Sequence, residues 1–157
     1  ITDYYTKEIV GYKVAPTLEE KYAIEALNMA IAHSKAYDLG KLIHHSDRGV
    51  QYASYTYTDI LKSNGISISM TESGNPKDNA VAERVNNTIK NELLMGMQFT
   101  CIEEVRAAVD AAVVFYNNER PHLSLDGMTP REAALCEGEI NKKWISYREK
   151  AIKSKMV

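Results

Sequence analysis

The chain has 157 residues, of which 45% are apolar and 25% are charged, as expected for one soluble globular domain. This composition excludes a low-complexity or disordered chain, and no stretch approaches the roughly eighteen consecutive apolar residues that a membrane span needs. The formal net charge of -2 and the pI of about 6.1 argue against a stand-alone nucleic-acid-binding domain, because such domains are usually strongly basic.

The two cysteines indicate a reducing compartment. Cys101 and Cys136 stand far apart and show neither paired metal-ligand spacing nor a disulfide framework. We expect both thiols to be buried. The N-terminal residues lack the charged-then-apolar pattern of a signal peptide, so we expect a cytoplasmic protein with no membrane partner.

The first third of the chain predicts strands followed by a helix. Residues 1–14 are expected to form two strand pieces joined by a polar turn, because β-branched and aromatic residues fill TDYYT and EIVGYKV. Thr17 to Glu20 has the form of a capping box, which predicts a helix from there to about Ala36. Its buried stripe should comprise Ala23, Leu27, Ala30 and Ile31, with His33 on the surface.

The run from Lys41 to His45 predicts a strand that ends at Asp47. In open α/β sheets ligands gather at the carboxyl ends of strands, which makes Asp47 a candidate site residue. Gly49 lets the backbone turn away without steric cost. His44 and His45 are adjacent and point to opposite faces of a strand, so we expect one to be packed and the other hydrogen-bonded rather than both to bind a metal.

The middle of the chain predicts a helix, a strand and a second helix. Ser54 is expected to cap a helix that ends at Asn64-Gly65, and Ile66, Ile68 and Met70 alternate with serines, as in a strand with one buried face. A loop without apolar residues follows at 71–78. Asp78 or Asn79 can cap the next helix, which should place Glu83, Asn87 and Lys90 on one face and Val81, Val85 and Ile89 on another.

Two further helices are expected after residue 100. Thr100 to Glu103 has the form of a capping box, and a core stripe follows at Val105, Val109, Ala112, Val113 and Tyr116. Thr129 should start the last core helix, with Pro130 at its first position. Residues 136–157 should form a basic helical extension. Its bases are Lys142, Lys143, Arg148, Lys150, Lys153 and Lys155.

Three segments, HSDRGVQY, GNPKDNAVAERVNNTIKNE and FYNNERPHLSLDGMTPREA, resemble the integrase-type core of bacterial insertion-sequence transposases, which are relatives of retroviral integrases. The resemblance covers residues 1–135 and implies an α/β, ribonuclease-H-like mixed sheet flanked by helices. It also implies an Asp-Asp-Glu triad in which Asp47 and Glu83 are the second and third members. The family's first Asp lies on a strand before the segment that resembles ITDYYTKEIVGY, so we expect this sequence to lack both that strand and that Asp; Asp3 is the alternative first ligand.

The resemblance further implies metal-dependent phosphoryl transfer on DNA. Asp47 and Glu83 would bind Mg²⁺ or Mn²⁺, two ions in the complete family site, and carboxylate oxygens are the ligands that such hard cations prefer. The alternative is a catalytically inactive core that keeps only nucleic-acid or partner binding. A ribonuclease-H-type nuclease outside transposition is a third interpretation, and the FYNNERPH block counts against it. We expect the chain as given not to catalyse strand transfer.

The implied partners are transposon-end and target DNA, further copies of the chain, and a separate helix-turn-helix domain or protein. Arg120 and His122 could contact phosphate, or they could tie their own loop to the core, and the sequence leaves both possibilities open. The candidate DNA-binding residues are Arg48, Lys77, Arg84, Asn87, Lys90, Arg120 and His122.

Overall fold

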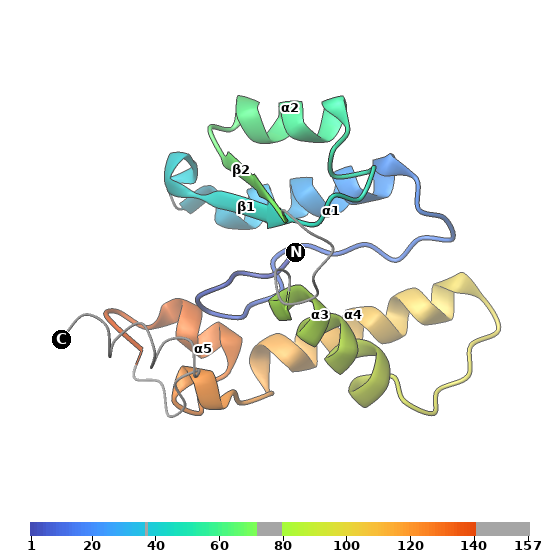
Figure 1. The fold of residues 1–157 in the computed structure, drawn as a ribbon. Coiled ribbons are helices and arrows are strands. Elements are labelled where there is room, and N and C mark those ends of the chain that lie inside the picture. The colour runs from blue at the N-terminus through green and yellow to red at the C-terminus, as the bar shows by residue number, and fades with distance from the viewer. Residues whose placement is uncertain (37, 72–79, 141–157) are drawn as a thin grey trace.

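A computed structural model describes residues 1–36, 38–71 and 80–140 (Figure 1). Its helices and strands confirm an α/β architecture. In chain order they are α1 (Glu20–His33), β1 (Ile43–Ser46), α2 (Tyr55–Ser63), β2 (Ser67–Met70), α3 (Ala80–Asn87), the π-helical turn η4 (Thr88–Leu93), α4 (Ile102–Asn118) and α5 (Pro130–Leu135). Short 3-10 turns lie at η1 (Ser34–Ala36), η2 (Leu39–Lys41) and η5 (Leu123–Leu125).

The sheet of the described residues consists of β1 and β2, which run parallel with Ile43 opposite Ser67 and Ser46 opposite Met70. The helix α2 connects them, as a parallel pair requires. A hydrophobic cluster of Leu27, Tyr57 and Leu61 packs α1 and α2 together, and Ile66 joins it at the start of β2. Each of these four side chains is buried.

A second cluster joins the N-terminal residues to α3 and α4. Its buried members are Ile9, Val85, Val113 and Tyr116. The Asn117 side chain accepts a hydrogen bond from the Ile9 N–H (2.9 Å) and donates one to the Ile9 carbonyl (3.0 Å). Figure 1 shows β1, β2, α1 and α2 in one part of the molecule, α3, α4 and α5 in the other, and the N-terminal segment between them.

The expected N-terminal strands do not form. Residues 1–14 contain a single antiparallel bridge, Thr2 to Ile9, and Lys7 lies in the left-handed region with φ of 64°. The Asp3 N–H and carbonyl close a turn with Glu8 and Lys7. Within the described residues no further strand lies beside this segment, so its β-favouring residues have no extended ladder to join.

Helix capping agrees with the prediction at two of four helices. Ser54 caps α2, and Thr129 with Glu132 forms the full capping box of α5 with Pro130 after the cap. The predicted boxes at Thr17 and Thr100 are wrong: α1 starts after Glu19 and α4 after Cys101, and neither cap residue makes a side-chain cap bond. The N-caps predicted for α3 at residues 78 and 79 lie outside the described residues.

The prediction that both thiols are buried is also wrong, because Cys101 and Cys136 are exposed. Each lies in extended backbone at a helix boundary, Cys101 just before α4 and Cys136 just after α5, and so outside the buried stripe of either helix. The expected extension at 136–157 lies mostly outside the described residues, which end at Ile140. No described helix has both the length and the apolar character needed to cross a membrane.

Candidate functional site

Asp47 directly follows β1, which ends at Ser46, one residue before the predicted end of the strand. Its side chain is exposed, and Oδ1 accepts a hydrogen bond of 2.9 Å from the Gly49 N–H. A side chain at residue 49 would be crowded, because a Cβ there would lie 2.9 Å from Gln51 Nε2 and 3.0 Å from Asp47 Oδ1, so that one of these side chains would have to shift. The glycine therefore allows the loop to fold closely around the carboxylate.

Arg48 ties the ends of the two strands together beside Asp47. Its Nε donates to the Thr71 carbonyl (2.8 Å), and the Thr71 N–H donates to the Ser46 carbonyl (3.0 Å). Thr71 and Ser46 are buried, and the Ser46 hydroxyl is a buried group with no hydrogen-bond partner among the described residues. These two hydrogen bonds therefore join the carboxyl ends of β1 and β2, while the Arg48 side chain stays at the surface.

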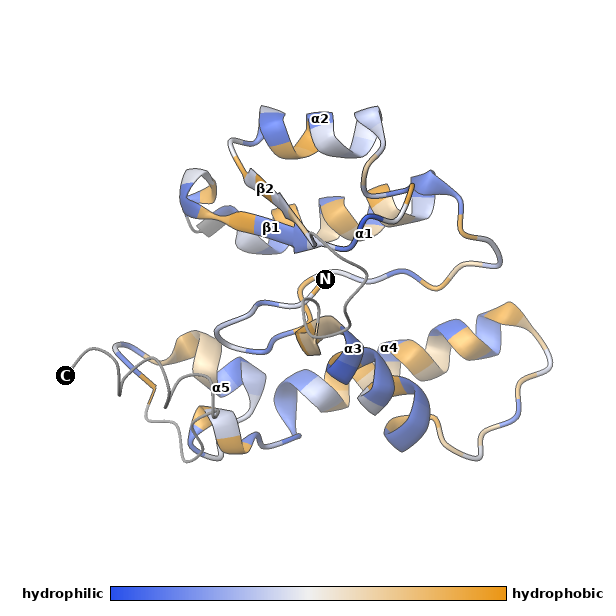
Figure 2. Ribbon diagram, in the orientation of Figure 1, coloured by the Kyte–Doolittle hydropathy of each residue, from blue (hydrophilic) through white to orange (hydrophobic). Residues whose placement is uncertain are grey.

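Glu83 lies in the first turn of α3, where the partial positive charge of the helix N-terminus favours a carboxylate. Val85 is buried on the opposite side, whereas Glu83, Asn87 and Lys90 are all exposed. Figure 2 shows α3 mainly in hydrophilic colours, in contrast to the apolar stripes of α1 and α4. The predicted division into one packing face and one polar face is confirmed for α3.

The helix changes its geometry immediately after Asn87. Residues Thr88–Leu93 form a π-helical turn, closed by a hydrogen bond from the Leu94 N–H to the Ile89 carbonyl. A π-turn rotates less per residue than an α-helix, so Lys90 does not continue the row of Glu83 and Asn87 as α-helical spacing would predict. Lys90 is exposed but faces a different direction around the axis.

The two histidines behave as expected from strand alternation. The half-buried His44 lies with Nε2 3.2 Å from the Tyr57 hydroxyl, and burial, aided by the N-terminal ammonium and His45, lowers its pKa to about 4. It is therefore neutral near pH 7. His45 is exposed and its Nδ1 lies 2.9 Å from Ser69 Oγ.

Asp3 has the contacts of a turn residue. Its Oδ1 accepts hydrogen bonds from the Thr6 N–H (2.6 Å) and the Thr6 hydroxyl (2.8 Å). Among the described residues, no three or more His, Cys, Asp or Glu side chains come together in a group that could hold a metal ion. Asp3 therefore does not complete a three-ligand site with Asp47 and Glu83.

Arg120 and His122 are tied to the core. The guanidinium of Arg120 donates to Glu92 Oε2 at 2.7 Å, and its Cζ lies 6.0 Å from the centroid of the Tyr116 ring. The His122 ring meets the same tyrosine edge-on with 5.0 Å between centroids. These contacts support the alternative in which both residues anchor their loop. Lys77 lies outside the described residues.

Two polar features of the structure were missed from the sequence. Glu8 is 5% exposed and pairs with His33 (3.2 Å) and Arg131 (3.3 Å), which ties the N-terminal segment to the end of α1 and the start of α5. Glu92 joins η4 to Arg120. The sequence signal that could have predicted the burial of Glu8 is its position at the start of the apolar segment EIVGY. Nothing local distinguishes Glu92 from a solvent-exposed helix charge.

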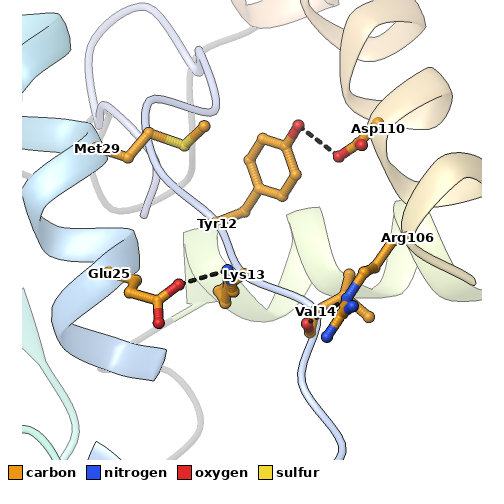
Figure 3. Close-up of a pocket in the computed structure, with 7 residues that line it drawn as sticks. All are labelled: Tyr12, Lys13, Val14, Glu25, Met29, Arg106 and Asp110. Carbon is orange, nitrogen blue, oxygen red and sulfur yellow. Dashed lines mark hydrogen bonds and ion pairs between the residues drawn. The ribbon is translucent and has the colours of Figure 1, made fainter. Parts of the chain in front are cut away.

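A pocket of about 260 Å³ lies between α1, α4 and residues 12–14 (Figure 3). The Tyr12 hydroxyl donates to Asp110 Oδ1 at 2.9 Å, and burial together with this bond raises the Tyr12 pKa to about 12. Lys13 forms an ion pair with Glu25 across the pocket. Each charged side chain that lines the pocket therefore has a partner, and neither Asp47 nor Glu83 lines it.

Comparisons with known proteins agree with this fold. Two family models, each described as an integrase core domain, match residues 1–76 and 64–130. The insertion element IS600 31 kDa protein of Shigella sonnei is 38% identical over 131 residues, covering 83% of this chain and 47% of the relative. The putative transposase for IS986/IS6110 of Mycobacterium tuberculosis is 34% identical over 136 residues, covering 84% and 49%. The chain thus spans about half the length of the curated relatives it matches.

Three similar solved structures are retroviral. The HTLV-2 integrase catalytic core domain in complex with magnesium is 20% identical with a TM-score of 0.56, covering 84% of this chain and 80% of that one. The BIV integrase catalytic core domain is 27% identical with a TM-score of 0.53, covering 76% and 74%. A simian T-cell lymphotropic virus intasome in complex with the PP2A subunit B56 gamma is 20% identical with a TM-score of 0.63, covering 85% and 46%. These structures share the ribonuclease-H-like fold, and the chain belongs to the integrase core domain family, among the cores of insertion-sequence transposases.

Proposed function

We propose that this chain is part of the catalytic core of a transposase that cuts and joins DNA by metal-dependent phosphoryl transfer. The observation that carries the proposal is the placement of two exposed carboxylates in an integrase core: Asp47 at the carboxyl end of the parallel strand β1, and Glu83 in the first turn of α3. Neither carboxylate is needed for packing, and a loop residue exposed on a rigid scaffold is a common source of function.

The carboxylates of Asp47 and Glu83 are the kind of ligand that a hard divalent cation prefers. Mg²⁺ is commonly held by one or two carboxylates, with water and substrate phosphates completing its octahedral shell. When bound, such ions activate the attacking oxygen and stabilise charge on the leaving oxygen. Asp47 and Glu83 would be the protein ligands from this chain, and the resemblance implies a further Asp outside residues 1–157. The contacts of Asp3 with Thr6 support its role as a turn residue.

Basic and polar side chains near the two carboxylates would hold the DNA backbone. Arg48 lies beside Asp47 and is fixed by Thr71, and Arg84 follows Glu83 on the exposed side of α3. Asn87 extends this surface, Lys90 is exposed on the π-turn that follows, and Lys77 precedes the helix in the sequence. Because the whole chain carries a net charge of -2, binding of a polyanion depends on such local clusters of cations.

The contacts of Arg120 and His122 favour an indirect role for these two residues. Arg120 is already neutralised by Glu92, and burial lowers the pKa of His122 to about 4, with Arg120, Lys7 and Arg84 contributing. His122 is therefore neutral at physiological pH and attracts phosphate less than a charged histidine would. We assign both to the anchoring of their loop rather than to direct phosphate contact.

One observation favours a second candidate function, a core that binds DNA or partner proteins without catalysing transfer. Within the described part of the chain, no group of three ligating side chains forms around Asp47 or Glu83. Assembly with further copies and with a separate helix-turn-helix protein is proposed for either function. The simian viral neighbour is itself part of an intasome, an assembly of that integrase.

A nicking and joining assay on matched element ends, with Mg²⁺ or Mn²⁺, tests both candidates. The proteins compared are residues 1–157, their Asp3→Asn form, and a longer protein in which the family's preceding strand is joined to residue 1. We expect activity in the longer protein alone, lost on Asp47→Asn or Glu83→Gln. Activity in residues 1–157 that disappears on changing Asp3 would show that Asp3 is the first ligand.

Two further outcomes complete this test. Binding of DNA without transfer in every form supports the non-catalytic core. Transfer that survives both Asp47→Asn and Glu83→Gln would overturn the assignment of the two carboxylates.

A further inference from the structure

A network of side chains connects η4 to the segment after α4. Glu92 on η4 accepts hydrogen bonds from Arg120 Nη2 (2.7 Å) and from the Thr88 hydroxyl (3.3 Å). The Arg120 guanidinium lies over the Tyr116 ring, which packs against His122. Both ends of the network are anchored in the interior, because Thr88 and Tyr116 are each 2% exposed.

The Arg120–Glu92 ion pair lies at the surface, and its arginine is partly covered. The Arg120 side chain is 28% exposed and the Glu92 side chain 47%. The hydrogen bond from Arg120 lowers the pKa of the Glu92 carboxyl, so that the carboxyl is charged at neutral pH. Since the tyrosine ring already restricts the guanidinium, less side-chain entropy is lost when the pair forms.

The Glu92 side of this ion pair lies in the π-helical turn η4, so the pair bears on the geometry of that turn. The turn η4 continues α3 without a break and presents Ile89 and Leu93 to the core cluster that contains Val85, while Glu92 faces Arg120. A π-turn is less favourable than α-helical backbone and is maintained where side chains hold it, often at functional sites. Here Thr88, Glu92 and Arg120 are the side chains that hold it.

The register of this turn sets the direction of Glu83. If the π-turn reverted to α-helical geometry, the register would change by one residue, and α3 would turn by about 100° relative to η4. A ligand must be held to within about 10–20° of its working orientation. Val85 and Glu83 lie on the same helix and turn together, so either both would rotate or Ile89 and Leu93 would leave the core cluster. The register of η4 therefore links the position of Glu83 to Glu92, nine residues further along the chain.

We propose that Arg120 is a positioning residue for Glu83, acting through Glu92 and the π-turn. This rests on the proposed function, in which Glu83 is a metal ligand. Arg120 touches neither DNA nor the ion in this role. Its task is to fix the rotation of α3 about its axis.

Two rival roles for Arg120 make different predictions. If Arg120 acted only by its charge, replacing it with Gln would strengthen cation binding at Glu83, and Glu92→Gln would weaken it. If Arg120 contacted phosphate directly, Glu92→Gln would strengthen DNA binding and leave ion binding unchanged. Positioning predicts that Arg120→Gln and Glu92→Gln both weaken ion binding, although they change the local charge in opposite directions.

The test uses Mn²⁺ alone as the probe and the ¹⁵N-labelled chain. Mn²⁺ broadens the amide signals of residues near its site, so a titration gives its affinity at Glu83 without any need for activity. We expect Arg120→Gln and Glu92→Gln each to weaken Mn²⁺ binding by about tenfold, as is usual for residues that orient a metal ligand. The charge-exchanged pair, Arg120→Glu with Glu92→Arg, should recover part of this loss. Arg106→Gln is the matched control. Arg106 lies on α4 and pairs with Glu103 (3.6 Å) rather than with a residue of η4.

The outcomes separate this proposal from the proposed function. If Glu83→Gln leaves Mn²⁺ broadening unchanged, the assignment of Glu83 as a ligand fails. If Glu83→Gln abolishes the broadening but Arg120→Gln and Glu92→Gln do not weaken it, the positioning role is overturned. Should Arg120→Gln fail to fold, Glu92→Gln carries the same test, because it leaves Arg120 over the Tyr116 ring.

Discussion

His44 and His122 should make the stability of this fold depend on pH in the acid range. Both rings are half-buried, and burial is the main cause that lowers each pKa to about 4. In the unfolded chain a histidine titrates near its ordinary value of about 6.5. Between these two values the unfolded chain binds more protons than the folded chain, so the free energy of unfolding rises with pH through this window. Above the window the contribution of each neutral histidine to stability is fully present.

The size of the effect follows from the two pKa values. When the pH falls from about 7.5 to about 5, one such histidine reduces the free energy of unfolding by about 2 kcal/mol. His44 and His122 lie in different clusters and should act additively, for a combined loss of about 4 kcal/mol. That is a large share of the roughly 5–15 kcal/mol that stabilises a typical domain.

Urea unfolding followed by far-UV circular dichroism at several pH values measures this loss. His44→Gln and His122→Gln should each lower stability near pH 7, because packing on Tyr57 or Tyr116 is lost, and should each reduce the acid-dependent loss by about 2 kcal/mol. Lys62→Ala, an exposed substitution on α2 that removes no histidine, is the control and should keep the wild-type loss. Equal acid-dependent losses in the wild type, His44→Gln and His122→Gln would refute the reasoning.

Three further predictions concern packing, capping and DNA. Leu27→Ala should destabilise the chain by about 2–5 kcal/mol in the same urea assay, because Leu27 is 2% exposed at the centre of its cluster; a loss below about 1 kcal/mol would contradict that packing. Thr129→Ala should cost about 1 kcal/mol through the lost cap of α5, and Thr129→Ser should restore most of it. Arg84→Ala and Lys90→Ala should each weaken binding to all DNA sequences alike and reduce the slope of log affinity against log salt by about 0.9, measured by fluorescence anisotropy with Lys62→Ala as the control. Unchanged slopes in both variants would exclude phosphate contacts there.

Local sequence signals predicted the elements that carry the candidate site. The apolar run before Asp47 and the glycine after it were sufficient to locate the end of β1. The helical spacing of Val81, Val85 and Ile89 likewise predicted which side of α3 faces the core. These predictions succeed because burial of an apolar stripe decides both the element and its exposed side, and both properties are visible within ten residues of sequence.

The capping boxes show where local signals stop being sufficient. Thr129 and Glu132 form their box, yet Thr17 and Thr100 have the same motif and do not. The Glu20 carboxylate accepts a hydrogen bond from the Ser54 hydroxyl at 2.5 Å instead, a partner 34 residues away. At the other site the Thr100 N–H and hydroxyl donate to Glu104, one residue beyond the motif. A competing partner, local or distant, moves the helix start.

The same limitation applies to the orientation of Glu83. An α-helix and a helix that widens at Thr88 have the same apolar spacing up to Asn87, so sequence periodicity cannot separate them. What separates them is the contact of Glu92 with Arg120, 28 residues further along the chain. Since that contact joins η4 to the segment after α4, the orientation of the proposed metal ligand depends on tertiary structure, whereas its presence on a helix does not. Substitutions at Arg120 and Glu92 should therefore alter the site without altering which residues compose it.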